Sequence, residues 1–139
     1  MNLQLVEKYG DRISSHSVEV KIDQTSPRTF YLPDDSILRG KQILEVFTRD
    51  NPNDNIVSPT GRNMVNDTIL DNSYLTLVCG NKRFWDDHPL TDLVSERNDG
   101  LHRQLYAPNF NPSKSSITVA GSTALTAGES FLLHFTYID

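Results

Sequence analysis

The chain has little of what most small enzymes, metalloproteins and membrane proteins require. Its 139 residues include one cysteine, Cys79, which excludes an internal disulfide and a metal site built from several thiolates. No apolar run approaches the roughly 18 residues of a membrane-spanning helix. The N-terminal MNLQLVEKYGDR has no long apolar core of the kind that a signal peptide needs. We therefore expect a soluble protein that is made without a cleaved leader.

The chain also lacks a cluster of positive charge. It carries 13 basic and 18 acidic residues, which gives a formal net charge of −5. The nearest approach to a basic patch is formed by Arg97, His102 and Arg103, and Asp99 lies among them. Binding to phosphate groups needs clustered Lys and Arg that displace counterions. We expect no sequence-independent binding to nucleic-acid phosphates, and no nucleic-acid partner that is recognised by its sequence.

No motif for nucleophilic catalysis or for phosphate binding is present. Ser58, Ser73 and Ser95 lie outside any Gly-x-Ser-x-Gly context, and a serine nucleophile needs an activating base. The segment GSTALTAG, residues 121 to 128, has neither the lysine nor the spacing of a phosphate-binding loop. Cys79 lies in the apolar run YLTLVC, where we expect it to be a small buried apolar side chain. The sequence predicts no catalytic residue and no cofactor, and so a protein that is not an enzyme.

Candidate metal ligands are scattered along the chain. No two of the four histidines (His16, His88, His102 and His134) have the spacing of a ligand pair on a helix or a tight strand. The segment DNPNDN, residues 50 to 55, is rich in side-chain oxygen atoms, as calcium loops are. It lacks the glycine at the sharp turn and the closing glutamate of such a loop. We expect no metal site.

What the sequence does contain is β-strand periodicity, most clearly in its last segment, ESFLLHFTYID. Phe131, Leu133, Phe135 and Tyr137 alternate with a second set of mostly apolar residues. This pattern predicts a strand that is buried on both faces. One face would fill a core, and the other would need a cover, either another sheet or a neighbouring molecule.

Shorter strand patterns precede this segment and are separated by turn-forming residues. They cover residues 16–22, 28–32, 74–79, 101–106 and 116–119. Short strands at fairly even spacing are typical of a β-sandwich or a barrel. The length fits one domain over residues 1–139. We predict an all-β fold.

The segment SILRGKQILEVFTRD gives two conflicting signals. Ile37, Gly40, Leu44 and Phe47 fall on helical spacing after a plausible helix start. Gly40, however, costs a helix about 1 kcal/mol relative to alanine, and the β-branched and aromatic residues that follow it favour a strand. We predict a strand over residues 38–48.

The stretch RFWDDHPL, residues 83 to 90, places a tryptophan, two carboxylates and a histidine next to one another. Paired carboxylates can share acid and base roles only where they converge, and adjacent residues of a regular strand point to opposite faces. Asp86, Asp87 and His88 before a proline also have strong turn character. We predict a structural turn between two strands, with Phe84 and Trp85 anchoring it on the sandwich.

The order of several segments resembles that of the single jelly-roll capsid proteins of tailless, membrane-containing bacteriophages. The segments are TFYLPDDSILRGKQILEVFT, SPTGR, NSYLTLV, HPLTDL and NPSKSSITV, within residues 29 to 119. The resemblance implies a single jelly-roll β-sandwich of two facing antiparallel sheets that assembles into a virion shell in the host cytoplasm. It carries no catalytic or ligand-binding residue over to this chain.

The resemblance also implies partners. A single small jelly roll fits a penton at a five-fold vertex, and a major capsid subunit is the next option. We expect a cyclic homo-oligomer of five subunits in contact with other capsid proteins. Residues 1–12 are a candidate arm that contacts neighbours or an underlying virion membrane.

Two other classes of function fit the same residues. The first is a carbohydrate- or receptor-binding sandwich, such as a phage spike domain, in which Trp85, Tyr106 and Phe110 would form a stacking platform; core or interface roles are the favoured reading of these aromatics. The second is a small β-sandwich or cupin-like enzyme, which tight metal binding through two or more histidines would favour.

Overall fold

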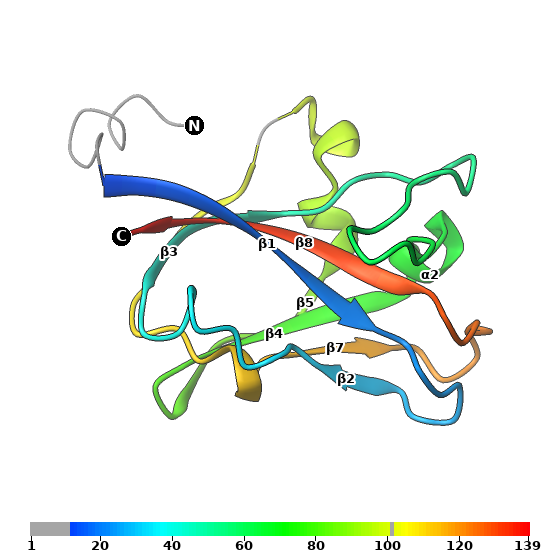
Figure 1. Cartoon of the computed structure of the whole chain (residues 1–139), viewed down its shortest axis with the longest axis horizontal. Coiled ribbons are helices and arrows are strands. Elements are labelled where there is room, and N and C mark those ends of the chain that lie inside the picture. Colours follow the sequence, from blue (N-terminus) through cyan, green and yellow to red (C-terminus); the bar gives the residue numbers. More distant parts are fainter. Residues whose placement is uncertain (1–11, 101) are drawn as a thin grey trace.

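The computed structural model describes residues 12–100 and 102–139, which form two facing four-stranded antiparallel sheets (Figure 1). One sheet has the order β1 (Ile13–Lys21), β8 (Ser130–Ile138), β3 (Gln42–Phe47) and β6 (Gln104–Ala107). The other has the order β2 (Thr29–Tyr31), β7 (Ser116–Val119), β4 (Ser73–Cys79) and β5 (Lys82–Pro89). The prediction of an all-β sandwich is confirmed.

Helical structure in the described residues is confined to short connections. They are the α-helix α2 (Asp67–Asp71) and the 3₁₀ turns η2 (Leu90–Leu93), η3 (Ser95–Asn98) and η4 (Pro112–Lys114). Asn66 caps α2, because its side-chain Oδ1 accepts a hydrogen bond from the Ile69 amide at 3.0 Å. Over residues 12–100 and 102–139, no helix is long and apolar enough to cross a membrane.

The strands pair in a nested order. The first strand pairs with the last, the second with the seventh, the third with the sixth, and the fourth with the fifth. Two further pairings, β3 with β8 and β4 with β7, join these pairs into the two sheets. Only the β4–β5 connection stays within one sheet; each of the others crosses to the facing sheet.

The core lies between the sheets and is made of alternate residues from each strand. Phe131, Leu133 and Phe135 of β8 are each at most 1% exposed, and the Phe135 ring lies 5.4 Å from that of Phe110. The other large, fully buried side chains are Ile22, Leu38, Ile43, Leu44, Met64, Ile69, Leu70, Leu75 and Leu77. Burial of this kind contributes about 25 cal/mol per Å² of apolar surface.

β8 is buried on both faces, as predicted, but its second face needs no neighbouring molecule. Leu132, Thr136 and Ile138 are 8%, 5% and 7% exposed within a single chain, and His134 is half-buried. Thr48 donates a hydrogen bond from its Oγ1 to the Leu132 carbonyl at 2.7 Å, so the segment after β3 helps to cover this face. The chain itself therefore supplies the cover that this face was expected to need.

Both signals in residues 36–48 prove to be partly correct. The strand β3 begins only at Gln42, and residues 36–40 form a turn. Within it, the Arg39 amide donates to the Asp35 carbonyl, and the Asp35 carboxylate accepts from the amides of Ile37 and Leu38, as at the start of a helix. Gly40 ends the turn with a φ of 77°, a conformation that favours glycine. The predicted strand was too long at its start.

The remaining strand predictions are confirmed, with boundaries that differ by a few residues. β1, β2, β4, β7 and β8 cover the predicted segments, and β6 covers the end of the segment predicted at 101–106. Leu101 itself and residues 1–11, which make up nearly all of the candidate arm, lie outside the described residues. The strand that was not predicted is β5.

Candidate functional site

The stretch RFWDDHPL is a strand, and the predicted turn is wrong. It forms most of β5, which is the edge of its sheet and pairs only with β4. None of the eight residues of β5 is fully buried. Charged residues and a terminal Pro89 protect such an edge from pairing with other chains, and the same residues resemble a turn in the sequence.

A bulge in β5 brings the two carboxylates to the same face of the sheet. Trp85 pairs with Leu77 and His88 with Leu75, so both Asp86 and Asp87 lie opposite the single residue Thr76. A bulge of this kind re-aims side chains and is frequent beside functional sites. The prediction that Asp86 and Asp87 diverge is wrong, because it assumed a regular strand.

Asp87 adopts the backbone conformation that the bulge requires. Its φ is 52°, in the left-handed region that asparagine and aspartate enter more readily than other non-glycine residues. The Asp87 amide donates a hydrogen bond to Thr76 Oγ1 at 3.1 Å, which attaches the bulge to β4. The geometry of the bulge is thus specified by side chains on both strands.

Asp86 and Asp87 line an open depression of about 290 Å³ on the outer face of this sheet, here called the sheet groove. Its lining residues are Thr29, Tyr31, Thr76, Val78, Arg83, Asp86, Asp87, Lys114, Ser116 and Thr118. A transverse row crosses all four strands: Tyr31 lies opposite Ser116, Ser116 opposite Thr76, and Thr76 opposite the two carboxylates. Hydrogen-bonding groups from segments far apart in the sequence therefore meet here.

The charged groups of the sheet groove are held in place by local contacts. Arg83 Nη1 lies 3.2 Å from both oxygens of the Asp86 carboxylate. Lys114, which lines the groove, donates from Nζ to Asn81 Oδ1 at 3.1 Å; Asn81 itself is not a lining residue. Thr29 Oγ1 and Thr118 Oγ1 are 3.2 Å apart and hydrogen-bonded. The groove thus offers donors and acceptors that are ordered but still accessible.

Trp85 and His88 support β5 and do not line the groove. The Trp85 ring packs against the core and stacks on the His88 ring, with centroids 4.1 Å apart. His88 Nε2 lies 2.8 Å from Asp92 Oδ2, and Arg103 Nε lies 2.6 Å from the same oxygen. The hydrogen bond from Arg103 lowers the pKa of Asp92 more than burial raises it. The anchoring role predicted for Trp85 is confirmed, whereas Phe84 is 40% exposed.

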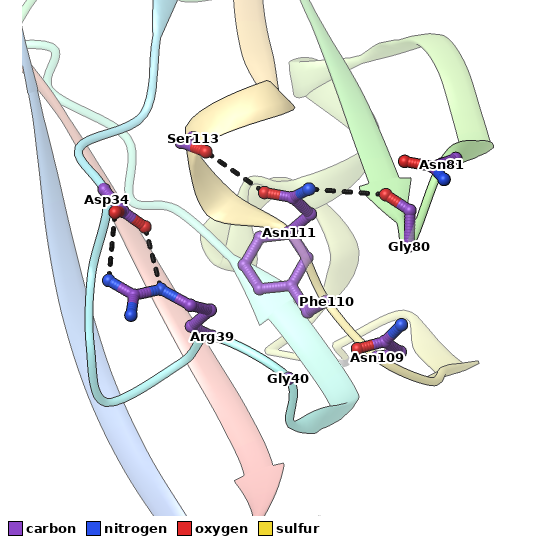
Figure 2. A pocket seen from close by; sticks show the side chains of 9 residues that line it. All are labelled: Asp34, Arg39, Gly40, Gly80, Asn81, Asn109, Phe110, Asn111 and Ser113. Atoms are coloured by element: carbon purple, nitrogen blue, oxygen red, sulfur yellow. Dashed lines mark hydrogen bonds and ion pairs between the residues drawn. The ribbon is translucent and has the colours of Figure 1, made fainter.

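A second pocket opens at one end of the sandwich, where three connections meet (Figure 2). This loop pocket has a volume of about 720 Å³ and is lined by Asp34, Arg39, Gly40, Gly80, Asn81, Asn109, Phe110, Asn111 and Ser113. Figure 2 shows Arg39 paired with Asp34, and Asn111 linking Ser113 to the Gly80 carbonyl. These polar side chains mostly form hydrogen bonds and ion pairs with one another, so the residues that line the loop pocket hold the three connections together.

Glycine is required at one position of the loop pocket. Gly80 has a φ of 60°, and a Cβ atom there would lie 3.2 Å from the Asn109 side chain. The Gly80 amide also donates to the Asn109 carbonyl at 2.8 Å. A larger residue would separate the β4–β5 hairpin from the loop that carries Asn109.

His16 in β1 and His134 in β8 each have a hydrogen-bond partner. His16 Nε2 lies 2.7 Å from Asp35 Oδ2, and His134 Nδ1 lies 2.7 Å from Ser17 Oγ. His102 and His134 both stack on Phe47, with centroids 3.8 and 4.9 Å from its ring. Burial, with Arg49 and His102 nearby, lowers the pKa of His134. In the described ranges, no three His, Cys, Asp or Glu side chains gather as a possible metal site.

One arrangement resembles a catalytic triad in composition. Ser95 Oγ lies 3.3 Å from His102 Nε2, and His102 Nδ1 lies 3.5 Å from Glu45 Oε2. The second distance exceeds the 2.7–3.2 Å that is usual for a hydrogen bond able to orient the ring. The Ser95 amide, a possible oxyanion donor, already donates to the Thr48 carbonyl. We assign these residues to packing beside β3.

The other serines and the oxygen-rich segment 50–55 have structural partners. Ser58 Oγ donates to Glu19, and Ser73 Oγ donates to the Ile69 carbonyl. Asn51 is 1% exposed, and its amide nitrogen donates to the carbonyls of Met64 and Val65. Asp50 pairs with Arg97 at 2.8 Å. Segment 50–55 therefore organises the loop through its own side chains.

Cys79 is half-buried, and burial raises the pKa of its thiol.

The aromatic residues considered for a stacking platform differ in their surroundings. Phe110 is 1% exposed and belongs to the core, whereas Tyr106 is 55% exposed on β6 of the other sheet. Together with Trp85, they do not form a common surface.

The residues of the sheet groove that sequence reasoning missed share one signal. Thr29 and Tyr31 flank Phe30, and Ser116 and Thr118 flank Ile117, so each short strand has a polar outer face. Aligning these faces required the pairing of strands that are distant in sequence.

Comparisons of the chain with protein-family models, curated proteins and solved structures found no match.

Proposed function

We propose that this protein is a structural, self-assembling jelly-roll subunit of a phage capsid, without catalysis. The observation that carries the proposal is the nested strand pairing, first with last through fourth with fifth. Eight antiparallel strands that fold as two Greek keys into facing sheets make a jelly roll, an architecture that viral capsid subunits use. The order of segments along the chain supports the same assignment.

The two flanks of the sandwich offer different surfaces for assembly. β1 and β2 are the edge strands of one flank, and β6 and β5 are the edge strands of the other. On the second flank, Phe84 on β5 and Tyr106 on β6 are 40% and 55% exposed. Contacts between unlike surfaces of identical subunits close into a ring when the rotation fits. A ring of five at a vertex is the assembly that we propose, in contact with other capsid proteins and an underlying membrane.

Native mass spectrometry at micromolar concentration tests the proposal. We expect a pentamer for the unchanged protein and a monomer for the double variant Phe84→Asp/Tyr106→Asp, because a charge would be buried in the contact. Val57→Asp is the control for an added surface charge, since Val57 is 55% exposed and lies on neither β5 nor β6. An unchanged protein that stays monomeric at every concentration would contradict the ring.

A carbohydrate- or receptor-binding module is the second candidate, and the sheet groove favours it. The groove presents ordered hydroxyl, carboxylate and cationic groups on one sheet face. A monomeric protein that binds a ligand there would move the assignment from shell subunit to binding module.

A further inference from the structure

The sheet groove combines features that core packing does not explain. Tyr31 is 64% exposed at one end of the transverse row, although a tyrosine ring gains free energy when it is covered. At the other end, the bulge of β5 holds two carboxylates on the outer face with Asp87 in a left-handed conformation. Strain of this kind persists where the surrounding structure maintains it, and it concentrates at sites of function.

The charges of the sheet groove select the class of ligand. Arg83 and Lys114 contribute two positive charges, and Asp86 and Asp87 contribute two negative ones, so the sum is zero. A phosphate or sulfate would be repelled by the carboxylates, and a metal ion by the cations. An apolar ligand would remove solvent from these charged groups, which is costly even where Arg83 and Asp86 pair with each other. A neutral ligand with many hydroxyl groups avoids all three conflicts.

The geometry also matches such a ligand. Carboxylates accept hydrogen bonds from hydroxyl groups, and Arg83 and Lys114 donate them. Thr76 and Ser116 on the floor are each 8% exposed and can act in both ways. The Tyr31 ring would cover the C–H face of a sugar. The volume of about 290 Å³ is at the small end of ligand sites and fits one or two sugar residues.

We infer that the sheet groove binds a neutral carbohydrate, with Tyr31 packing on a sugar ring and Asp86 and Asp87 accepting hydrogen bonds from its hydroxyl groups. The inference goes beyond the proposed shell role. It holds for a ring of subunits and for a solitary module, because neither edge strand of the groove has to be free for the sugar to reach its floor.

An array of defined neutral and acidic glycans, followed by titration with the best neutral binder, tests the inference. We expect a neutral glycan to bind and to shift the amide resonances of Thr76 and Ser116. Tyr31→Ala and the double variant Asp86→Asn/Asp87→Asn should each weaken binding at least about tenfold. Ile37→Ala is the control, because Ile37 is 44% exposed and does not line the groove, so this change should leave affinity unchanged.

Three outcomes would overturn the inference. They are an array without any bound glycan, binding of acidic glycans alone, and binding that Tyr31→Ala leaves unaltered. Thermal unfolding of each variant establishes that the fold is kept, so a loss of binding reports on the groove. Because the array is independent of oligomer mass, its failure leaves the ring proposal standing, and a monomeric protein leaves the carbohydrate inference standing.

Discussion

β8 lies in the centre of its sheet between β1 and β3, whereas β5 is the edge of the other sheet and pairs only with β4. Eight of the nine residues of β8 are buried and the ninth is half-buried, while β5 has no buried residue. β8 runs alongside β1 for its whole length, and β3 pairs with residues 134–138 on its other side (Figure 1). The two strands differ in what surrounds them and, at the β5 bulge, in backbone geometry.

The contrast teaches where sequence patterns carry structural information. A central strand must match neighbours on both sides, so its apolar residues recur regularly. An edge strand must avoid pairing with other chains, and it does so with charges, bulges and proline. These devices interrupt the alternation and resemble turn chemistry. In this protein the interrupted strand is also the one that shapes the groove.

The largest expected difference between the two strands lies in the loss of an aromatic ring. Phe135→Ala in β8 should lower the free energy of unfolding by about 4 kcal/mol, because the ring is 1% exposed and leaves a cavity. Trp85→Ala in β5 should cost about 2 kcal/mol, since that ring is only partly buried. Urea unfolding followed by circular dichroism measures both values. Equal losses would show that β5 contributes as much to the core as β8 does.

The second difference concerns carboxylates. Burial alone would raise the pKa of Glu19 on β1, but hydrogen bonds from Ser130, Thr60 and Ser58 outweigh it, so the pKa is lowered. Glu19→Gln should cost about 2 kcal/mol at pH 7, because these hydrogen bonds would lose their charged acceptor. Asp86→Asn on β5 should cost less than about 0.5 kcal/mol, since Asp86 and Arg83 form an exposed pair.

The effect of Glu19 should depend on pH in a defined direction. A carboxyl with a lowered folded-state pKa stabilises the protein above its unfolded-state pKa, and this contribution is lost as the pH falls through the folded-state value. The difference between the unchanged protein and Glu19→Gln should therefore be constant from pH 7 to about pH 5 and shrink below about pH 4. A stability difference that grows as the pH falls would show that folding does not lower the pKa of Glu19.

The smallest expected difference between two compared variants comes from the backbone of the β5 bulge. Asp87→Val should destabilise by about 1 kcal/mol, because a β-branched residue disfavours a φ of 52°. Asp87→Asn is the matched variant, since asparagine tolerates this conformation and should change stability by less than about 0.5 kcal/mol. Thermal melts of the two variants side by side provide the measurement. A Val variant as stable as the Asn variant would argue for a regular strand.

Most of the fold was predictable because it depends on local alternation. The periodicity of residues 131–138 and the polar-apolar alternation of residues 16–22 predicted β8 and β1 directly. The start of β3 was not predictable, because a glycine at position 40 is compatible with a left-handed turn and also with the interior of a strand. Which of the two applies depends on the contact between the Gly40 amide and the Phe110 carbonyl, far along the chain.

The sheet groove was less predictable than the fold. Asp86 and Asp87 stood out in the sequence as paired carboxylates, but the rule that adjacent strand residues point to opposite faces predicted that their side chains diverge. Only the register with β4, which places Trp85 opposite Leu77 and His88 opposite Leu75, reveals the bulge. The local signal of Tyr31 is only the polar outer face of a short strand, and its role depends on three strands that follow it in the sequence.

The pairing of β1 with β8 has a consequence for synthesis of the chain. Ile13 lies opposite Ile138, so the first strand has no partner until the last strand has left the ribosome. Val18 and Val20, both buried in the final structure, must remain exposed during that interval. Contacts between such distant residues also slow folding. The sandwich should therefore close in a late step, after residues 130–138 have emerged, and the unpaired strands are prone to aggregate before then.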